Sequence, residues 1–98
     1  MTDVLPIDRY VIATLMRDLV GHDHRPSAFL VYLALLDLAE SGRAALSHAQ
    51  LAEQTGLSKR AVQDAICHLA RRGLIMVKRA GRTEPAIVQP LSPWRRGG

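Results

Sequence analysis

The sequence has little cysteine, the residue that stabilises many small proteins through disulfides or zinc sites. Cys67 is its only cysteine among 98 residues, which excludes an internal disulfide and a cysteine-based zinc site. No apolar run reaches the roughly 18 residues that cross a bilayer. The N-terminal residues also lack the charged-then-apolar pattern of a secretory signal. Because a chain of this length is too short for two independent cores, we expect one small cytoplasmic domain.

Motifs of catalysis are also missing. The sequence has no glycine-rich phosphate loop, no His-Glu-x-x-His pair and no matched nucleophile and base. We therefore expect neither an enzyme nor a cofactor. His22 and His24 supply two imidazoles on one loop, which is short of the four ligands of a zinc site. No metal is expected there. Helix capping explains the adjacent Ser47 and His48 better than catalysis does.

Acidic and basic residues are segregated along the chain. Residues 1–57 hold four bases and seven acids, a net charge of −3, whereas residues 58–98 hold nine bases and two acids, a net charge of +7. Evenly scattered bases would give the same isoelectric point near 10.0 without this asymmetry. The segregation predicts that the C-terminal half binds a polyanion. A solvated basic face is the alternative.

Apolar periodicity predicts a mainly α fold with a small β-hairpin. Residues 7–20 carry apolar side chains at helical spacing, and Gly21 is placed to end that helix. The helix 27–40 is apolar nearly all round, so it is central or buries a second face against another subunit. The other expected elements are helices 47–55 and 58–72 and strands 74–79 and 86–90. They form one domain, 1–91, followed by a flexible basic tail at 92–98.

Two of these helices meet at a three-residue turn. The first begins with Ser47-His48-Ala49-Gln50, which has the form of a capping box, and Ser58 is placed to cap the second. Ala52 permits a close helix crossing, Gly56 can adopt a positive φ, and Leu57 fills the angle between the helices. This pattern indicates a helix-turn-helix.

Three segments, PSAFLVYLALL at 26–36, LAEQTGLSKRAVQ at 51–63 and HLARRGLI at 68–75, resemble the winged helix-turn-helix family of bacterial and phage DNA-binding domains. The nearest branch includes transcription regulators and replication initiators. In such domains the second helix of the motif lies in the major groove and the hairpin, or wing, contacts the DNA. The resemblance implies a recognition set of Ser58, Lys59, Arg60, Gln63 and Asp64 and a wing set of Lys78, Arg79 and Arg82. Glu84-Pro85 in the short wing loop favours backbone contact over minor-groove insertion.

The helix 58–72 separates into an apolar stripe and a polar outward face with Arg60, Gln63, Asp64, Cys67 and Arg71. Arginine and glutamine match the major-groove edges of guanine and adenine. Lys59 and Arg60 lie in the first turn, where the helix dipole disfavours cations, so a DNA partner explains them better than helix stability. Asp64 repels phosphate unless it accepts from a cytosine amino group or pairs with Arg60 or Arg71.

The sequence thus predicts a sequence-specific double-stranded DNA-binding protein, a transcriptional regulator in the bacterial nucleoid. Its phosphate anchors are Lys59, Arg71, Lys78, Arg79 and Arg82. Surplus apolar surface on helices 7–20 and 27–40 suggests a homodimer on a palindromic site. A replication-initiation or plasmid-maintenance module and a protein–protein adaptor stay open, as does a redox switch at Cys67. Trp94 is expected to pack on the first helix.

Overall fold

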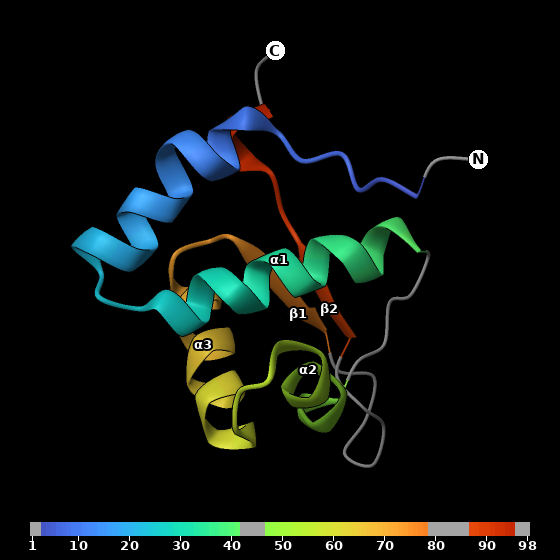
Figure 1. Ribbon diagram of the computed structural model, residues 1–98. Helices are drawn as coiled ribbons and strands as arrows, with labels where there is room; N and C mark the ends of the chain where they lie inside the picture. Colours follow the sequence, from blue (N-terminus) through green and yellow to red (C-terminus); the bar gives the residue numbers. More distant parts are fainter. Residues whose placement is uncertain (1–2, 42–46, 79–86, 96–98) are drawn as a thin grey trace.

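The computed structural model describes residues 3–41, 47–78 and 87–95. Figure 1 shows α1 crossing the centre, with the first helical segment on one side, α2 and α3 on the other, and β1 and β2 behind it. The predicted mainly α fold with a hairpin is confirmed. In chain order the elements are η1 (Val11–Leu15), η2 (Arg17–His22), α1 (Pro26–Glu40), α2 (His48–Thr55), α3 (Lys59–Arg71), β1 (Ile75–Lys78), β2 (Ile87–Pro90) and η3 (Pro93–Arg95).

The first helical segment consists of η1 and η2 joined at Met16 and is called the N-terminal helix below. Its hydrogen bonding is π-helical, since the Met16 N–H donates to the Val11 carbonyl five residues earlier. The backbone of Met16 is itself helical, with φ −59° and ψ −48°. Val11, Leu15 and Leu19 are buried at four-residue spacing. One face of the N-terminal helix therefore belongs to the core, as its apolar spacing predicts.

The N-terminal helix ends later than its sequence predicts. Gly21 lies inside η2, and the left-handed residue is His24, with φ 56°. The Asp23 N–H donates to the Asp18 carbonyl at 2.8 Å, and the Arg25 N–H reaches back to Leu19 at 2.7 Å. These two hydrogen bonds span five and six residues and satisfy carbonyls in the last turn of the helix. The chain therefore reverses at His24 and not at Gly21.

The central helix is α1, which contacts the N-terminal helix, α2, α3 and β2. Tyr32 is completely buried in it, and its hydroxyl donates to the Leu91 carbonyl at 2.7 Å. This bond satisfies the one polar atom of that side chain. The predicted central position of α1 is confirmed. Its other buried residues are Ala28, Phe29, Val31, Ala34, Leu35 and Leu38.

The hairpin pairs β1 with β2 in antiparallel register, with Ile75 opposite Pro90 and Lys78 opposite Ile87. Ile75 and Val88 face the core and are buried. Pro90 ends the ladder because it has no N–H to donate. The predicted wing strands are confirmed at slightly shorter lengths. Residues 79–86, which join them, lie outside the described residues.

Trp94 and Arg95, from the segment separated above as a tail, contact the residues that lead into the N-terminal helix. The Trp94 ring stacks on Tyr10 with centroids 4.6 Å apart, as its packing role predicts, and its Nε1–H donates to the Asp8 carboxylate at 2.8 Å. Arg95 donates to the same carboxylate through Nε and Nη2, each at 2.6 Å. These hydrogen bonds, from Arg95 first and then Trp94, lower the pKa of Asp8 to about 2. The segment before the N-terminal helix and the segment after β2 are thereby joined through one carboxylate.

Candidate nucleic-acid interface

The start of α2 is fixed by the capping box that its sequence predicts. The Ser47 hydroxyl accepts from the Gln50 N–H at 3.1 Å, and the Gln50 side-chain carbonyl accepts from the Ser47 N–H at 3.0 Å. Two backbone donors that a helix start leaves unpaired are satisfied in this way. A helix of only eight residues therefore begins at a defined position.

The turn between α2 and α3 depends on backbone conformation and on one hydroxyl. Gly56 has φ 81°, which a side chain would disfavour. The Thr55 hydroxyl donates to the Leu51 carbonyl at 2.7 Å and accepts from the Leu57 N–H at 3.2 Å. Leu57 then packs against the core. The roles of Gly56 and Leu57 are predicted from the sequence. The role of Thr55 is not, although threonine hydroxyls commonly bond the backbone in turns.

The second helix of the motif, α3, presents its charged side chains to solvent. The Ser58 hydroxyl caps it by accepting from the Ala61 N–H at 3.1 Å, and Gly73, with φ 73°, follows its end. Val62, Ala65, Ile66 and Leu69 are buried, as the apolar stripe predicts. The side chains that the sequence assigns to the outward face are all exposed: Lys59, Arg60, Gln63, Asp64, Cys67 and Arg71.

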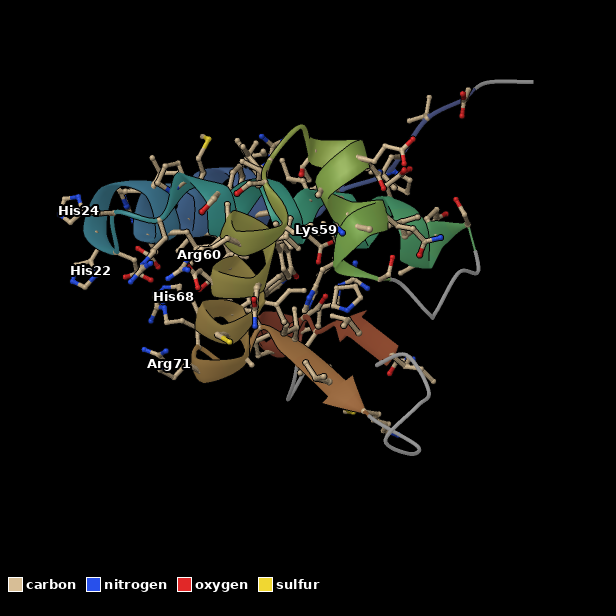
Figure 2. All side chains as sticks on the ribbon, turned by 90° about the horizontal axis from the view of Figure 1, so that it is seen from below. His22, His24, Lys59, Arg60, His68 and Arg71 are labelled. Atoms are coloured by element: carbon tan, nitrogen blue, oxygen red, sulfur yellow. The ribbon has the colours of Figure 1, made fainter. Side chains whose placement is uncertain are left out.

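The exposed cations of α3 point in two directions. Figure 2 shows Arg60, His68 and Arg71 on the side facing the turn that carries His22 and His24, and Lys59 on the other side, next to α2. Within the described ranges, no carboxylate lies within 4.0 Å of the guanidinium of Arg60 or Arg71. Asp64 therefore does not neutralise either arginine, and both keep their charge for a partner.

The C-terminal end of α3 is attached to the turn before α1 through Asp23. The Asp23 carboxylate lies 2.8 Å from Nε2 of His68, 2.9 Å from Nδ1 of His22 and 3.0 Å from Nε of Arg72. Hydrogen bonds from His22 and then His68 lower the pKa of Asp23 to about 2. This group is not predictable from the sequence, because Asp23 and His68 are 45 positions apart in the chain. The part of the chain that the structure describes holds no cluster of three His, Cys, Asp or Glu side chains suited to a metal ion.

Of the predicted wing set, Lys78 lies within the described residues. Lys78 is exposed at the end of β1, on the strand that directly follows α3. Arg79 and Arg82 of the predicted wing set, and Glu84-Pro85, lie outside the described residues.

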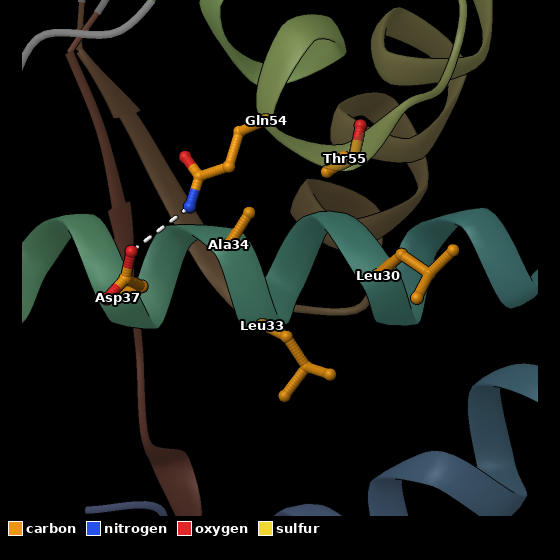
Figure 3. A pocket seen from close by; sticks show the side chains of 6 residues that line it. All are labelled: Leu30, Leu33, Ala34, Asp37, Gln54 and Thr55. Atoms are coloured by element: carbon orange, nitrogen blue, oxygen red, sulfur yellow. Dashed lines mark hydrogen bonds between the residues drawn. The ribbon is translucent and has the colours of Figure 1, made fainter. Parts of the chain in front are cut away.

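A hollow on the surface between α1 and α2 is mostly apolar. Its volume is about 340 Å³, and it is lined by Leu30, Leu33, Ala34, Asp37, Gln54 and Thr55. Figure 3 shows the Gln54 amide donating to Asp37 across it, at 3.1 Å. Asp37 is its one charged residue, so this hollow does not suit a polyanion. The hydrogen bond from Gln54 to Asp37 links α2 to α1.

Two helices joined by a tight turn, with an antiparallel hairpin directly after them, define a winged helix-turn-helix domain. A family model described as a helix-turn-helix domain matches residues 25–75, just over half of the chain. The chain belongs to this family, and the domain implies a DNA partner. No curated protein and no solved structure matches the chain significantly. None of the described helices is long and apolar enough to span a membrane.

Proposed function

We propose that the protein binds double-stranded DNA sequence-specifically by placing α3 in the major groove, and that it regulates transcription at the bacterial nucleoid. The supporting observation is the exposed pair Arg60 and Gln63 on the second helix of the motif. These side chains form bidentate contacts with guanine and adenine edges, respectively. Asp64 accepts from a cytosine amino group in this arrangement, because it has no cationic partner within the described residues.

Phosphate contacts position α3 in the groove. Ser58 uses its oxygen to cap α3 and keeps its own proton for donation to a phosphate oxygen. The cationic anchors are Lys59, Arg71, Lys78, Arg79 and Arg82. If about four phosphates are neutralised, log K falls with log salt at a slope of roughly −4 per protomer.

The apolar surface of the N-terminal helix supports a homodimer. Ile12, Met16 and Val20 are 50%, 40% and 39% exposed and recur every four residues, one position after the buried set. Leu30 on α1 is exposed as well. Solvent exposure of several large apolar side chains marks interaction surfaces. Two protomers joined through these helices bind a palindromic site, which doubles the sequence that one short α3 reads.

The proposal is tested by selecting bound sequences from a random duplex pool and recording the footprint length. We expect one enriched motif with two inverted half-sites. Weak binding without enrichment overturns the proposal and favours a protein–protein adaptor. An enriched motif located at a replication origin favours replication initiation over transcription.

A further inference from the structure

A pocket of about 220 Å³ lies between the start of α1 and the outward face of α3. It is lined by Arg25, Asp64, Cys67, His68 and Arg71. Arg25 is the residue directly before α1, whereas the other four belong to α3. Figure 2 shows His68 and Arg71 on this side of α3. The pocket therefore borders the surface assigned above to DNA, at the edge farthest from Lys59.

The charges around the pocket are unevenly placed. Asp64 and Arg71 are two turns apart on α3, which separates them by about 10 Å along the helix axis. Asp23 already pairs with His68 and Arg72. Arg25 and Arg71 are exposed, and no carboxylate of the described chain lies within 4.0 Å of their charged nitrogens. The pocket lining thus contains two guanidinium groups, those of Arg25 and Arg71, that form no ion pair within the described residues.

We infer that Arg25 and Arg71 together bind one phosphate group in this pocket, supplied by the DNA backbone beside the groove that α3 enters. This inference rests on the proposed function and adds Arg25, which lies outside both the recognition helix and the wing. Guanidinium groups donate paired N–H bonds that match phosphate oxygens. The N-terminus of α1, a helix of 15 residues, adds a partial positive charge next to Arg25. The contact fixes α1 and α3 to the same DNA strand.

The test compares Arg25→Ala with Arg17→Ala on the selected duplex. Arg17 is also an exposed arginine, on the N-terminal helix, but it does not line the pocket. We expect Arg25→Ala to weaken binding about 10-fold and to reduce the salt slope by about 1, with the sequence preference unchanged. Arg17→Ala leaves both values at the wild-type level. Equal binding by the two variants, while the wild type binds normally, overturns the inference and leaves the proposed function intact.

Neutral methylphosphonates, introduced one at a time into the duplex, identify the phosphate concerned. A methylphosphonate at one position should weaken DNA binding by the wild-type protein and leave DNA binding by Arg25→Ala unchanged. Loss of binding at that position in both proteins assigns the phosphate to another residue and overturns the inference.

A titration with inorganic phosphate separates a backbone phosphate from a free one. Saturable NMR shifts of the Arg25 side chain, combined with wild-type DNA binding by Arg25→Ala, mark a free-phosphate site and overturn the DNA source. If the wild-type protein binds no duplex, the proposed function is wrong, and this titration alone decides whether the pocket takes phosphate.

Discussion

The Asp23 carboxylate lies 2.8 Å from Nε2 of His68, across 45 positions of the sequence, and 3.0 Å from Nε of Arg72. Both partners belong to the C-terminal end of α3. The side chain that fixes this end of the helix therefore comes from the turn before α1, outside the helix-turn-helix itself. That turn therefore adds to the packing that fixes the orientation of α3, the helix that carries Arg60 and Gln63.

Replacing Asp23 with asparagine should lower the free energy of unfolding by about 1–3 kcal/mol at pH 7, because the charge that His68 and Arg72 bond is lost. Urea denaturation followed by circular dichroism measures the change. Asp64→Asn is the matched control, since Asp64 is exposed and such substitutions stay within about 0.5 kcal/mol. Equal losses in the two variants would show that the contacts of Asp23 contribute no net stability.

Acid should destabilise the protein in a defined window. The pKa values of Asp8 and Asp23 are lowered from 3.8 to about 2, chiefly by hydrogen bonds from Arg95 and from His22, respectively. Below an unfolded-state pKa near 3.8, the unfolded chain binds more protons than the folded one, so unfolding becomes easier. The contribution of both groups is complete above about pH 4 and is lost as the pH falls towards about 2.

Urea midpoints measured at fixed ionic strength from pH 6 to pH 2 test this window. The double variant Asp8→Asn with Asp23→Asn should show a shallower decline below about pH 4 than the wild type. A decline of the same steepness would mean that other carboxyl groups cause it.

Two substitutions at left-handed residues should change stability in opposite directions. His24 has φ 56° and Gly56 has φ 81°, a conformation that costs a residue with a side chain about 1–2 kcal/mol. His24→Gly should raise the free energy of unfolding by up to about 1 kcal/mol, and Gly56→Ala should lower it by about 1 kcal/mol. A Cβ at Gly56 would meet no atom within 4 Å, so only the backbone is affected. Thermal unfolding that shifts both variants in one direction would contradict the expectation.

Arg60 and Lys78 should affect DNA binding differently. Arg60→Ala should cost about 1–3 kcal/mol on the selected site and relax the preference at one base pair, because a base contact is lost. Lys78→Ala should weaken binding to all sequences equally and reduce the salt slope by about 1. Binding isotherms on the selected site and its single-base variants measure both effects. Uniform weakening by Arg60→Ala would make Arg60 a phosphate contact, and no effect would favour the adaptor.

The proposed homodimer should dissociate when a charge is placed on the N-terminal helix. Met16→Lys puts an ammonium group between Ile12 and Val20, and sedimentation should then show a monomer. Met76→Lys is the matched control, because Met76 on β1 is 38% exposed, close to the 40% of Met16. A monomeric wild type, or dissociation of both variants alike, would overturn this interface.

Elements defined by neighbouring residues were predicted closely from the sequence. The bounds of α2 and α3 follow from Ser47, Gly56 and Ser58, each of which bonds a backbone group within four residues of itself. Hydrogen bonds between residues this close in the chain can be predicted from a short sequence pattern. The same holds for α1, whose near-continuous apolar surface predicts either a central position or a second face buried against another subunit.

Contacts between distant residues could not be predicted in this way. Nothing in the sequence around Asp23 indicates His68, and nothing around Asp8 indicates Trp94 and Arg95. These pairs form only after α1 has brought the segments together. The end of the N-terminal helix differs from the prediction for another reason. Glycine is the usual left-handed residue after a helix, but here His24 takes that conformation, and the N–H groups of Asp23 and Arg25 bond carbonyls five and six residues earlier.

Trp94 is the only tryptophan in the chain, and its indole sits against the phenol of Tyr10 with its N–H on a carboxylate. Intrinsic tryptophan fluorescence therefore reports whether Trp94 stays packed against Tyr10. A melting curve followed by that signal records the release of Trp94 from Tyr10. The behaviour of α3 needs a separate label, and the exposed thiol of Cys67 on that helix is a suitable attachment point.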